Sequence, residues 1–430
     1  MGNLKFALSM LKKNYKNGIV YTLTLAFTTA IVFIFFNIIE NQYLISKDEL
    51  SMNMYGYIST NFSQLLAFII VLFCAFMIVF AYNFYVSKKH SEIAIMTMSG
   101  SSFLKVTAYL IYQTVVMSLI AFTIGVILGY GCAIFVNQYI YELIHVEAPF
   151  FYIPKQCYLD TIVCVLSILA FEVLYISGYV YRKDISYLLM QEHAPLATDE
   201  RILKYPSWIY PTIYITGIVF LFMSYTPVSA IFPSIVGSIG VGGTIKYFLP
   251  KVFRFIKDKK YLADKITLIS MSNLYYSLKN SSMLIGVYAV SVTVMNSLMI
   301  MLKASPREFM TSSIGFVVLT ILVLACIVYK YVLEASTRKR FYANLYKIGF
   351  VKEQMKRIVK KEVISFYFTI YILPMIYIVI SLVQSFVHGD LDIGLFVFII
   401  AFLTLAIVIA GVFTYYSYKK EVVIGGDSHE

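Results

Sequence analysis

Residues of the types that carry out chemistry are few in this sequence, and they are not grouped as catalysis requires. The five histidines are far apart, and none has the spacing of metal ligands: His90, His145, His193, His388 and His429. No Ser-His-Asp set indicates a nucleophile. No Gly-x-x-x-x-Gly-Lys-Ser/Thr segment, the loop that holds nucleotide phosphates, occurs. The sequence therefore predicts no metal site and no hydrolase, and ATP-driven work would need a separate ATPase.

Glu172 is the one acidic residue predicted to lie deep within a membrane span. A carboxylate in that position is costly and is functional by default. It could be a structural or substrate-lining side chain, or a proton relay. We favour the first interpretation because no His or Lys is predicted at mid-span elsewhere. Gln113 and Asn296 are predicted to hydrogen-bond between helices, with each bond contributing about 1 kcal/mol or less.

The composition indicates that membrane-spanning helices position these side chains. Of the 430 residues, 60% are hydrophobic and 13% charged, and the mean hydropathy is +0.78. Soluble globular, disordered and disulfide-scaffold proteins are excluded, and the apolar runs exceed barrel strands of about ten residues. The predicted fold is an all-α polytopic membrane protein. About ten helices would span the membrane, near residues 18–39, 63–86, 104–136, 159–181, 208–225, 228–249, 281–302, 312–333, 364–386 and 392–417.

The third run is longer than the bilayer is thick, so it must tilt, bend or project into water. Gly125, Gly129 and Gly131 would ease a bend there. The runs at 208–225 and 228–249 are punctuated by prolines, and they could form a tight or partly re-entrant hairpin.

The distribution of basic residues predicts the orientation. If the N-terminus is cytoplasmic, all but four of the 35 Lys and Arg residues lie on the inner side; the exceptions are Lys47, Lys155, Lys303 and Arg307. The positive-inside rule then places both termini in the cytoplasm. It also accounts for the net charge of +12 without a nucleic-acid partner. The first apolar run is too long for a signal peptide, so we expect it to remain as an anchor.

Two segments occur twice in the same order. A basic amphipathic stretch leads into the first span (residues 4–17), and a similar one leads into the seventh (residues 266–280). Residues 82–100 parallel residues 331–349 at a constant offset of 249, and each has a basic cluster, a short apolar-faced helix and a final glycine. Any two basic span exits could look alike, but the shared order favours a duplication about an axis along the membrane normal.

The predicted organisation therefore has three parts. Residues 1–185 form a four-span half with its N-terminal amphipathic helix, residues 186–260 a linker and two-span insert, and residues 261–430 a second four-span half.

Residues 88–131 resemble the FtsX-like permease domain of ABC transporters. That domain has a charged span exit, a Glu-Ile pair followed after six residues by a glycine, and a glycine-rich third span. Glu92, Ile93 and Gly100 occupy the turn positions here.

The arrangement of four, two and four spans is similar to the bacitracin-resistance (Bce-type) permeases of the MacB-like superfamily. Two features depart from that pattern. The second copy has Phe341 and Tyr342 in place of the Glu-Ile pair, although it keeps Gly349. Bce-type permeases also carry a large extracellular domain between spans seven and eight, where this sequence has only residues 303–311.

The resemblance implies that the two post-span helices are coupling helices, each docking on one subunit of a cytoplasmic ATPase dimer. The alternative is that their apolar faces merely lie on the membrane interface. The candidate ATPase-coupling residues are Glu92, Ile93, Met96, Met98 and Gly100 in the first copy, and Tyr342, Leu345, Tyr346 and Gly349 in the second.

The sequence thus predicts the permease subunit of an ATP-binding-cassette transporter in the cell membrane of a Gram-positive-type bacterium. It would have no cofactor of its own, since ATP and Mg²⁺ would be bound by the partner ATPase. The expected partners are that ATPase, membrane lipid and an amphipathic peptide, such as an antimicrobial peptide or bacteriocin that is exported or resisted. The alternatives are a mechanotransmitting regulatory subunit for a wall hydrolase or sensor kinase, and a secondary transporter that uses Glu172.

Overall fold

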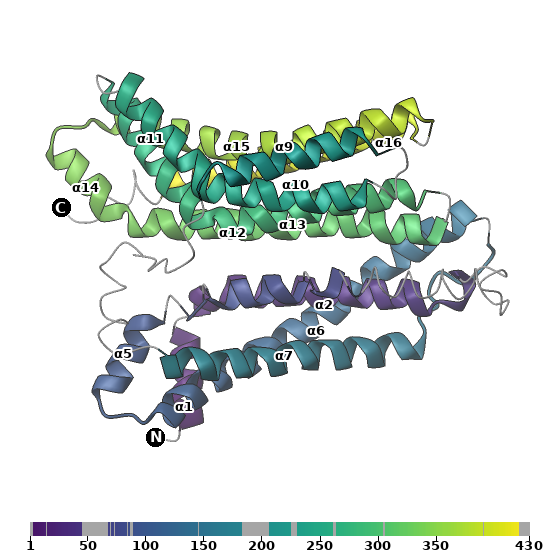
Figure 1. Ribbon diagram of the computed structural model, residues 1–430. Helices are drawn as coiled ribbons and strands as arrows, with labels where there is room; N and C mark the ends of the chain where they lie inside the picture. Colours follow the sequence, from purple (N-terminus) through teal and green to yellow (C-terminus); the bar gives the residue numbers. More distant parts are fainter. Residues whose placement is uncertain are drawn as a thin grey trace. The chain divides into compact units, whose positions relative to one another are not determined.

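A computed structural model of the chain (Figure 1) describes residues 3–44, 68–182, 206–224, 230–260, 264–303 and 306–420, apart from residues 14, 69, 73, 84, 87, 88, 145 and 390. The secondary structure of this part is helical, and no strand occurs in it. The chain forms two compact units, residues 1–202 and 203–430.

The first unit is built around three long helices that pack against one another, α2, α6 and α7. Its elements are α1 (Asn3–Lys13), α2 (Tyr15–Glu40), the 3-10 helix η1 (Gln42–Leu44), an apolar helix at Ile70–Asn83, α5 (His90–Met98), α6 (Phe103–Ile144) and α7 (Lys155–Arg182). With 42 residues, α6 is about 63 Å long, so it extends well beyond a hydrocarbon core of about 30 Å.

Glycines in α6 bring it close to α2. A Cβ added to Gly125 would lie 2.6 Å from the carbonyl oxygen of Ala26, and one added to Gly129 would lie 3.0 Å from the Cβ of Phe33. The helix is uninterrupted through these positions. The glycines expected to ease a bend therefore include two that permit close helix packing, which small residues favour in membranes.

The second unit surrounds α12, which packs against α10, α11, α13 and α15. Its elements are α9 (Ile209–Phe222), α10 (Ile231–Gly243), the π-helical turn η2 (Thr244–Phe248), α11 (Leu249–Lys260), α12 (Lys265–Met301), α13 (Pro306–Thr337), α14 (Lys339–Lys347), α15 (Lys352–Val387) and α16 (Ile393–Lys419). The two helices of the predicted insert, α9 and α10, lie in this unit together with the helices of the predicted second half.

The prediction of an all-α polytopic membrane protein is confirmed. Seven helices of the described part are long and apolar enough to cross a membrane: α2, α6, α7, α12, α13, α15 and α16. The count of ten is not confirmed, because none of the other three runs forms a helix within the described residues that is long and apolar enough to cross. For example, α9 has 14 residues and is about 21 Å long, less than the core thickness.

The two predicted leading segments are arranged differently. In the first copy α1 runs across the direction of α2 (Figure 1) and packs on α6, where the buried carbonyl of Ala7 accepts a hydrogen bond from Gln113. In the second copy the leading segment and the following span form one continuous helix of 37 residues, α12. Its first turn is capped by Asp264, whose side chain accepts a hydrogen bond from the backbone N–H of Ile266 (3.1 Å).

Candidate functional site

The two short helices α5 and α14 begin in the same way. At the offset of 249 residues, Lys89 and Arg338 are the N-cap residues. The carbonyl of Lys89 accepts the first helical hydrogen bond from the N–H of Ile93 (2.9 Å), and that of Arg338 accepts it from Tyr342 (3.1 Å). The repeat seen in the sequence is therefore also a repeat of backbone structure.

The two helices also end in the same way. Gly100 and Gly349 have positive φ angles of 80° and 99°. Each closes its helix by a six-residue hydrogen-bonded turn, a Schellman motif that favours glycine because a Cβ is strained in the left-handed region. The closing bonds run from the N–H of Ser101 to the carbonyl of Met96 (3.1 Å) and from the N–H of Phe350 to that of Leu345 (3.0 Å).

The positive φ angle of Gly349 leads to a testable prediction. Nothing lies within 4 Å of a Cβ added at Gly349, so Gly349→Val should be destabilising through its backbone alone, by about 1–3 kcal/mol, and should lower the melting temperature. Asn tolerates the left-handed region, so Gly349→Asn should be milder. Gly394→Val is the matched control, because that glycine also has open space around it but no positive φ. Equal melting temperatures for the two valine variants would contradict the prediction.

In the second copy, a buried salt bridge fixes the start of α14. One guanidinium nitrogen of Arg338 donates to Glu362 of α15 (2.7 Å). The other donates to Glu334 of α13 (2.7 Å) and to the hydroxyl of Ser277 of α12 (3.0 Å). The Glu362 side chain is fully buried, so it relies on these partners in place of water.

Glu362 is the centre of a larger hydrogen-bonded group, here called the Glu362 cluster. Its carboxylate also accepts hydrogen bonds from side chains of α12, α13 and α16: Asn273 (3.1 Å), Ser277 (3.2 Å), Tyr331 (2.7 Å) and Tyr418 (3.4 Å). The hydroxyl of Tyr342, on α14 itself, accepts from Asn273 and lies 3.3 Å from that of Tyr418. The cluster comprises Asn273, Ser277, Tyr331, Glu334, Arg338, Tyr342, Glu362 and Tyr418, so all five helices from α12 to α16 meet at it.

The ionisable side chains of the cluster shift one another's pKa values. Burial raises the pKa of Glu334, and the nearby Arg338 reverses that rise only in part. Burial alone would lower the pKa of Arg338, but the carboxylates of Glu362 and Glu334 more than offset this and raise it well above its ordinary value. Arg338 therefore stays charged in the buried cluster, and the tendency of Glu334 toward its neutral form limits the net charge.

The first copy fixes α5 by a more local arrangement. The ammonium of Lys89 is fully buried and binds both carboxylate oxygens of Glu92 (2.8 and 3.1 Å). The hydroxyl of Tyr109 on α6 donates to the same carboxylate (2.6 Å). Glu92 keeps 15% of its side chain exposed, so in this copy the ion pair reaches the surface.

Neutral side chains replace the buried acids in the first copy. At the offset of 249, Gln113 corresponds to Glu362 and Tyr85 to Glu334. The hydroxyl of Tyr85 donates to Gln113 (2.6 Å), and the Gln113 amide donates to the carbonyl of Ala7 (3.1 Å). Equivalent positions therefore hold a neutral hydrogen-bond chain in one copy and an ionic cluster in the other.

The candidate coupling residues divide into inward-facing and outward-facing groups. Ile93, Tyr342 and Leu345 are buried and hold their helices against the protein. Glu92 and Met96 are half-buried. Outward-facing apolar side chains are Met98 (67% exposed) and Tyr346 (56%), with three that the sequence did not single out: Ile95 (63%), Phe341 (42%) and Ile348 (76%).

The intramembrane polar residues differ in their partners. Glu172 is buried and accepts a hydrogen bond from the hydroxyl of Tyr21 (2.7 Å), which links α7 to α2. Gln113 makes the two bonds given above. Asn296 is buried, but within the described part of the chain neither side-chain atom has a hydrogen-bond partner, so the bond expected there stays a prediction. No group of three metal-binding side chains occurs among the described residues.

Comparisons with known proteins place these features in context. Residues 64–185, which include α5, α6 and α7, match the FtsX-like permease C-terminal family. The bacitracin export permease protein BceB of Bacillus subtilis (strain 168) is 22% identical over 297 residues, which cover 64% of this chain and 44% of that protein. The chain thus spans less than half the length of this curated relative. The predicted resemblance to FtsX-like and Bce-type permeases is confirmed.

Proposed function

We propose that this chain is the membrane-spanning permease subunit of an ATP-binding-cassette transporter, and that α5 and α14 are its coupling helices. The observation that carries the proposal is that these two helices have the same backbone structure at both ends. Both have the same capping bonds at a constant offset of 249, and both turn through a left-handed glycine into a long helix, α6 or α15. A matched pair of such helices suits the two subunits of an ATPase dimer.

The anchoring of these helices supports a mechanical role. A short helix transmits movement only if it is held firmly to the helices that must move. The Glu362 cluster joins α14 to α12, α13, α15 and α16 through buried hydrogen bonds, and the pair Lys89–Glu92 with Tyr109 joins α5 to α6. Closure of the ATPase dimer, which binds the ATP and Mg²⁺, would thereby tilt the long helices. The termini and these helices lie on the cytoplasmic side in this proposal.

The substrate we propose is an amphipathic peptide that is met at the membrane. Between the end of α12 (Met301) and the start of α13 (Pro306) there is no room for a large folded domain, so recognition falls to the helices and the lipid around them. The relative is named for the export of bacitracin, a peptide antibiotic. This substrate class is tested by measuring whether amphipathic peptides stimulate ATP hydrolysis by the permease and its ATPase in nanodiscs. Hydrolysis that ignores every amphipathic peptide but responds to a wall hydrolase would favour a regulatory subunit instead.

Docking is tested by the outward-facing residues. Met98→Asp and Tyr346→Asp place a charge where an apolar side chain would be buried by the ATPase. Each should reduce co-purification of the ATPase about fivefold or more, as expected for interface residues that cost over about 1 kcal/mol. Met98→Leu and Tyr346→Phe keep the apolar surface and should retain the partner. If both aspartate variants still co-purify with the ATPase at the parental level, these helices do not dock and only lie on the membrane interface.

A further inference from the structure

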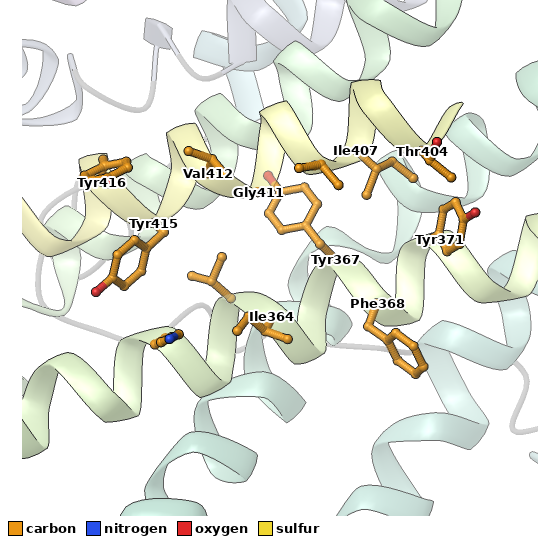
Figure 2. Close-up of a pocket in the computed structure, with 13 residues that line it drawn as sticks. Ile364, Tyr367, Phe368, Tyr371, Thr404, Ile407, Gly411, Val412, Tyr415 and Tyr416 are labelled. Atoms are coloured by element: carbon orange, nitrogen blue, oxygen red, sulfur yellow. The ribbon is translucent and has the colours of Figure 1, made fainter. Parts of the chain in front are cut away.

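The second unit carries a groove that the proposed coupling role does not use. It lies between α15 and α16 and has a volume of about 520 Å³. Figure 2 shows side chains of the two helices on either side of it, with Tyr367 reaching toward Gly411. Several lining side chains are strongly exposed, among them Phe368 (60%) and Val408 (60%), so the groove opens to the surface of this unit.

One lining position of the groove, Gly411, has no side chain. A Cβ added to Gly411 would lie 3.6 Å from the ring of Tyr367, so any larger residue would project into the space above that ring. Two polar groups in the middle of the wall are satisfied locally. The Tyr367 hydroxyl lies 2.6 Å from that of Thr414, and the Thr404 hydroxyl donates to the carbonyl of Ile400 (2.9 Å). An occupant therefore meets an apolar surface.

The length of the groove matches one leaflet of a bilayer. Its lining on α15 runs from Lys360 to Tyr371, a helical rise of about 16 Å. Half of a hydrocarbon core of about 30 Å is about 15 Å. A single extended acyl chain would therefore fill it from end to end.

One end of the groove is positively charged. Lys360 is exposed and has no carboxylate partner among the described residues, whereas its neighbours are occupied: Lys356 pairs with Glu353 (2.6 Å) and Lys361 with Asp264 (3.7 Å). The basic last turn of α16 lies just beyond the same end. A cation at the end of an apolar groove of leaflet length is complementary to a lipid with an anionic headgroup.

We propose that this groove binds one acyl chain of an anionic phospholipid, whose headgroup phosphate pairs with Lys360. The acyl chain of the lipid would lie along Ile364, Phe368 and Val412, and Gly411 would leave room for it. Lys360 and Val363 lie on either side of Glu362 along α15, so the bound lipid packs within one turn of the Glu362 cluster. Lipid binding itself does not depend on the chain being a transporter subunit.

The chain offers a clean test because it has a single tryptophan, Trp208. In a Trp208→Phe background, Phe368→Trp places a reporter in the groove. Leu405→Trp places one beside the lining residue Thr404 but outside the groove, with the same starting exposure (61% against 60%). The chain is reconstituted in vesicles of phosphatidylcholine with acyl-brominated phosphatidylglycerol or acyl-brominated phosphatidylcholine, and quenching of tryptophan fluorescence gives the relative affinity of the two lipids at each reporter.

The expected preference for phosphatidylglycerol at the groove reporter is about fivefold, the effect of about 1 kcal/mol for one lysine near an anionic headgroup, with none at the outer reporter. Lys360→Gln should abolish it, and the control Lys420→Gln should not. Gly411→Leu should reduce quenching by both lipids only in the groove. Equal preference at the two reporters, or a preference that survives Lys360→Gln, would overturn the proposal. Groove quenching well below that at the outer reporter would also overturn it, since another protein surface would then occupy the groove.

Discussion

Replacing Arg338 with methionine should be among the most damaging single changes in the chain. It removes the only cation of the Glu362 cluster and leaves a fully buried carboxylate whose salt-bridge partner is gone. Breaking one side of a buried ion pair costs about 3–5 kcal/mol. The loss should appear as a lower free energy of unfolding in micelles titrated with a denaturing detergent, and as a lower melting temperature.

Lys89→Met is the matched control, because Lys89 is the equivalent N-cap of the first copy. Its partner Glu92 is 15% exposed and keeps the hydrogen bond from Tyr109, so the cost should be smaller, about 1–2 kcal/mol. Equal losses from the two methionine variants would show that the two anchors are equivalent, against our interpretation.

A double variant separates stability from coupling. Arg338→Met with Glu362→Gln removes one of the two buried carboxylate charges that Arg338 neutralises, and it keeps an amide that can still bond to Tyr331 and Asn273. Part of the stability should therefore return. The direct link between α14 and α15 would remain broken. ATPase co-purification should then be normal while peptide-stimulated hydrolysis stays low, a combination that a purely structural role of Arg338 does not predict.

The Glu362 cluster is a feature that sequence patterns do not reveal. Glu362 lies two residues before the predicted start of its span and directly after Lys360 and Lys361, so the sequence groups it with the basic loop. Its partner Arg338 is 24 residues away on another helix, and no helical spacing reveals such a pair. The constant offset of 249 is the one signal that points to it, since it aligns Glu362 with Gln113, a predicted intramembrane polar residue.

The short helices themselves are predictable from the sequence, but the orientation of α5 is not. Apolar residues occur all around α5, so periodicity does not select the face that packs, and only the tertiary fold places Ile93 inside and Ile95 outside. In α14, by contrast, polar and apolar residues segregate, which fits the burial of Tyr342 and Leu345. The long spans are predictable because an uninterrupted run of about 20 apolar residues is the pattern of a membrane-spanning helix, whereas α9 is too short for that argument.

The insert helices brace α15 by bonds that no sequence pattern indicates. The hydroxyl of Tyr214 on α9 donates to the carbonyl of Leu373 (2.9 Å), next to Pro374 within α15. That of Tyr377 donates back to the carbonyl of Tyr214 (3.1 Å), and Gln384 donates to the carbonyl of Leu221 (2.8 Å). Because proline interrupts the hydrogen bonding of a helix, α15 has its weakest point where α9 supports it.

Gly240→Ala should break this brace. A Cβ at Gly240 would lie 2.6 Å from the backbone nitrogen of Tyr214 and 2.7 Å from its Cα. Both are main-chain atoms, so no side-chain rotation relieves the overlap and α9 must move away from α10. Overpacking of this kind costs about 1–3 kcal/mol, and the shift would also strain the bond from Tyr214 to Leu373. We expect a clear fall in melting temperature.

The control for this change is Gly394→Ala on α16, which introduces the same methyl group where nothing lies within 4 Å and should be neutral or slightly stabilising. Tyr214→Phe removes the hydroxyl bond without steric strain and should cost about 1 kcal/mol. If the insert braces α15, Gly240→Ala should also reduce peptide-stimulated ATP hydrolysis while the ATPase still co-purifies, because α15 carries Glu362 and hence the link to α14. If Gly240→Ala is as stable as the Gly394→Ala control, α9 and α10 are not held together at this contact. In that case α9 does not brace α15 near Pro374.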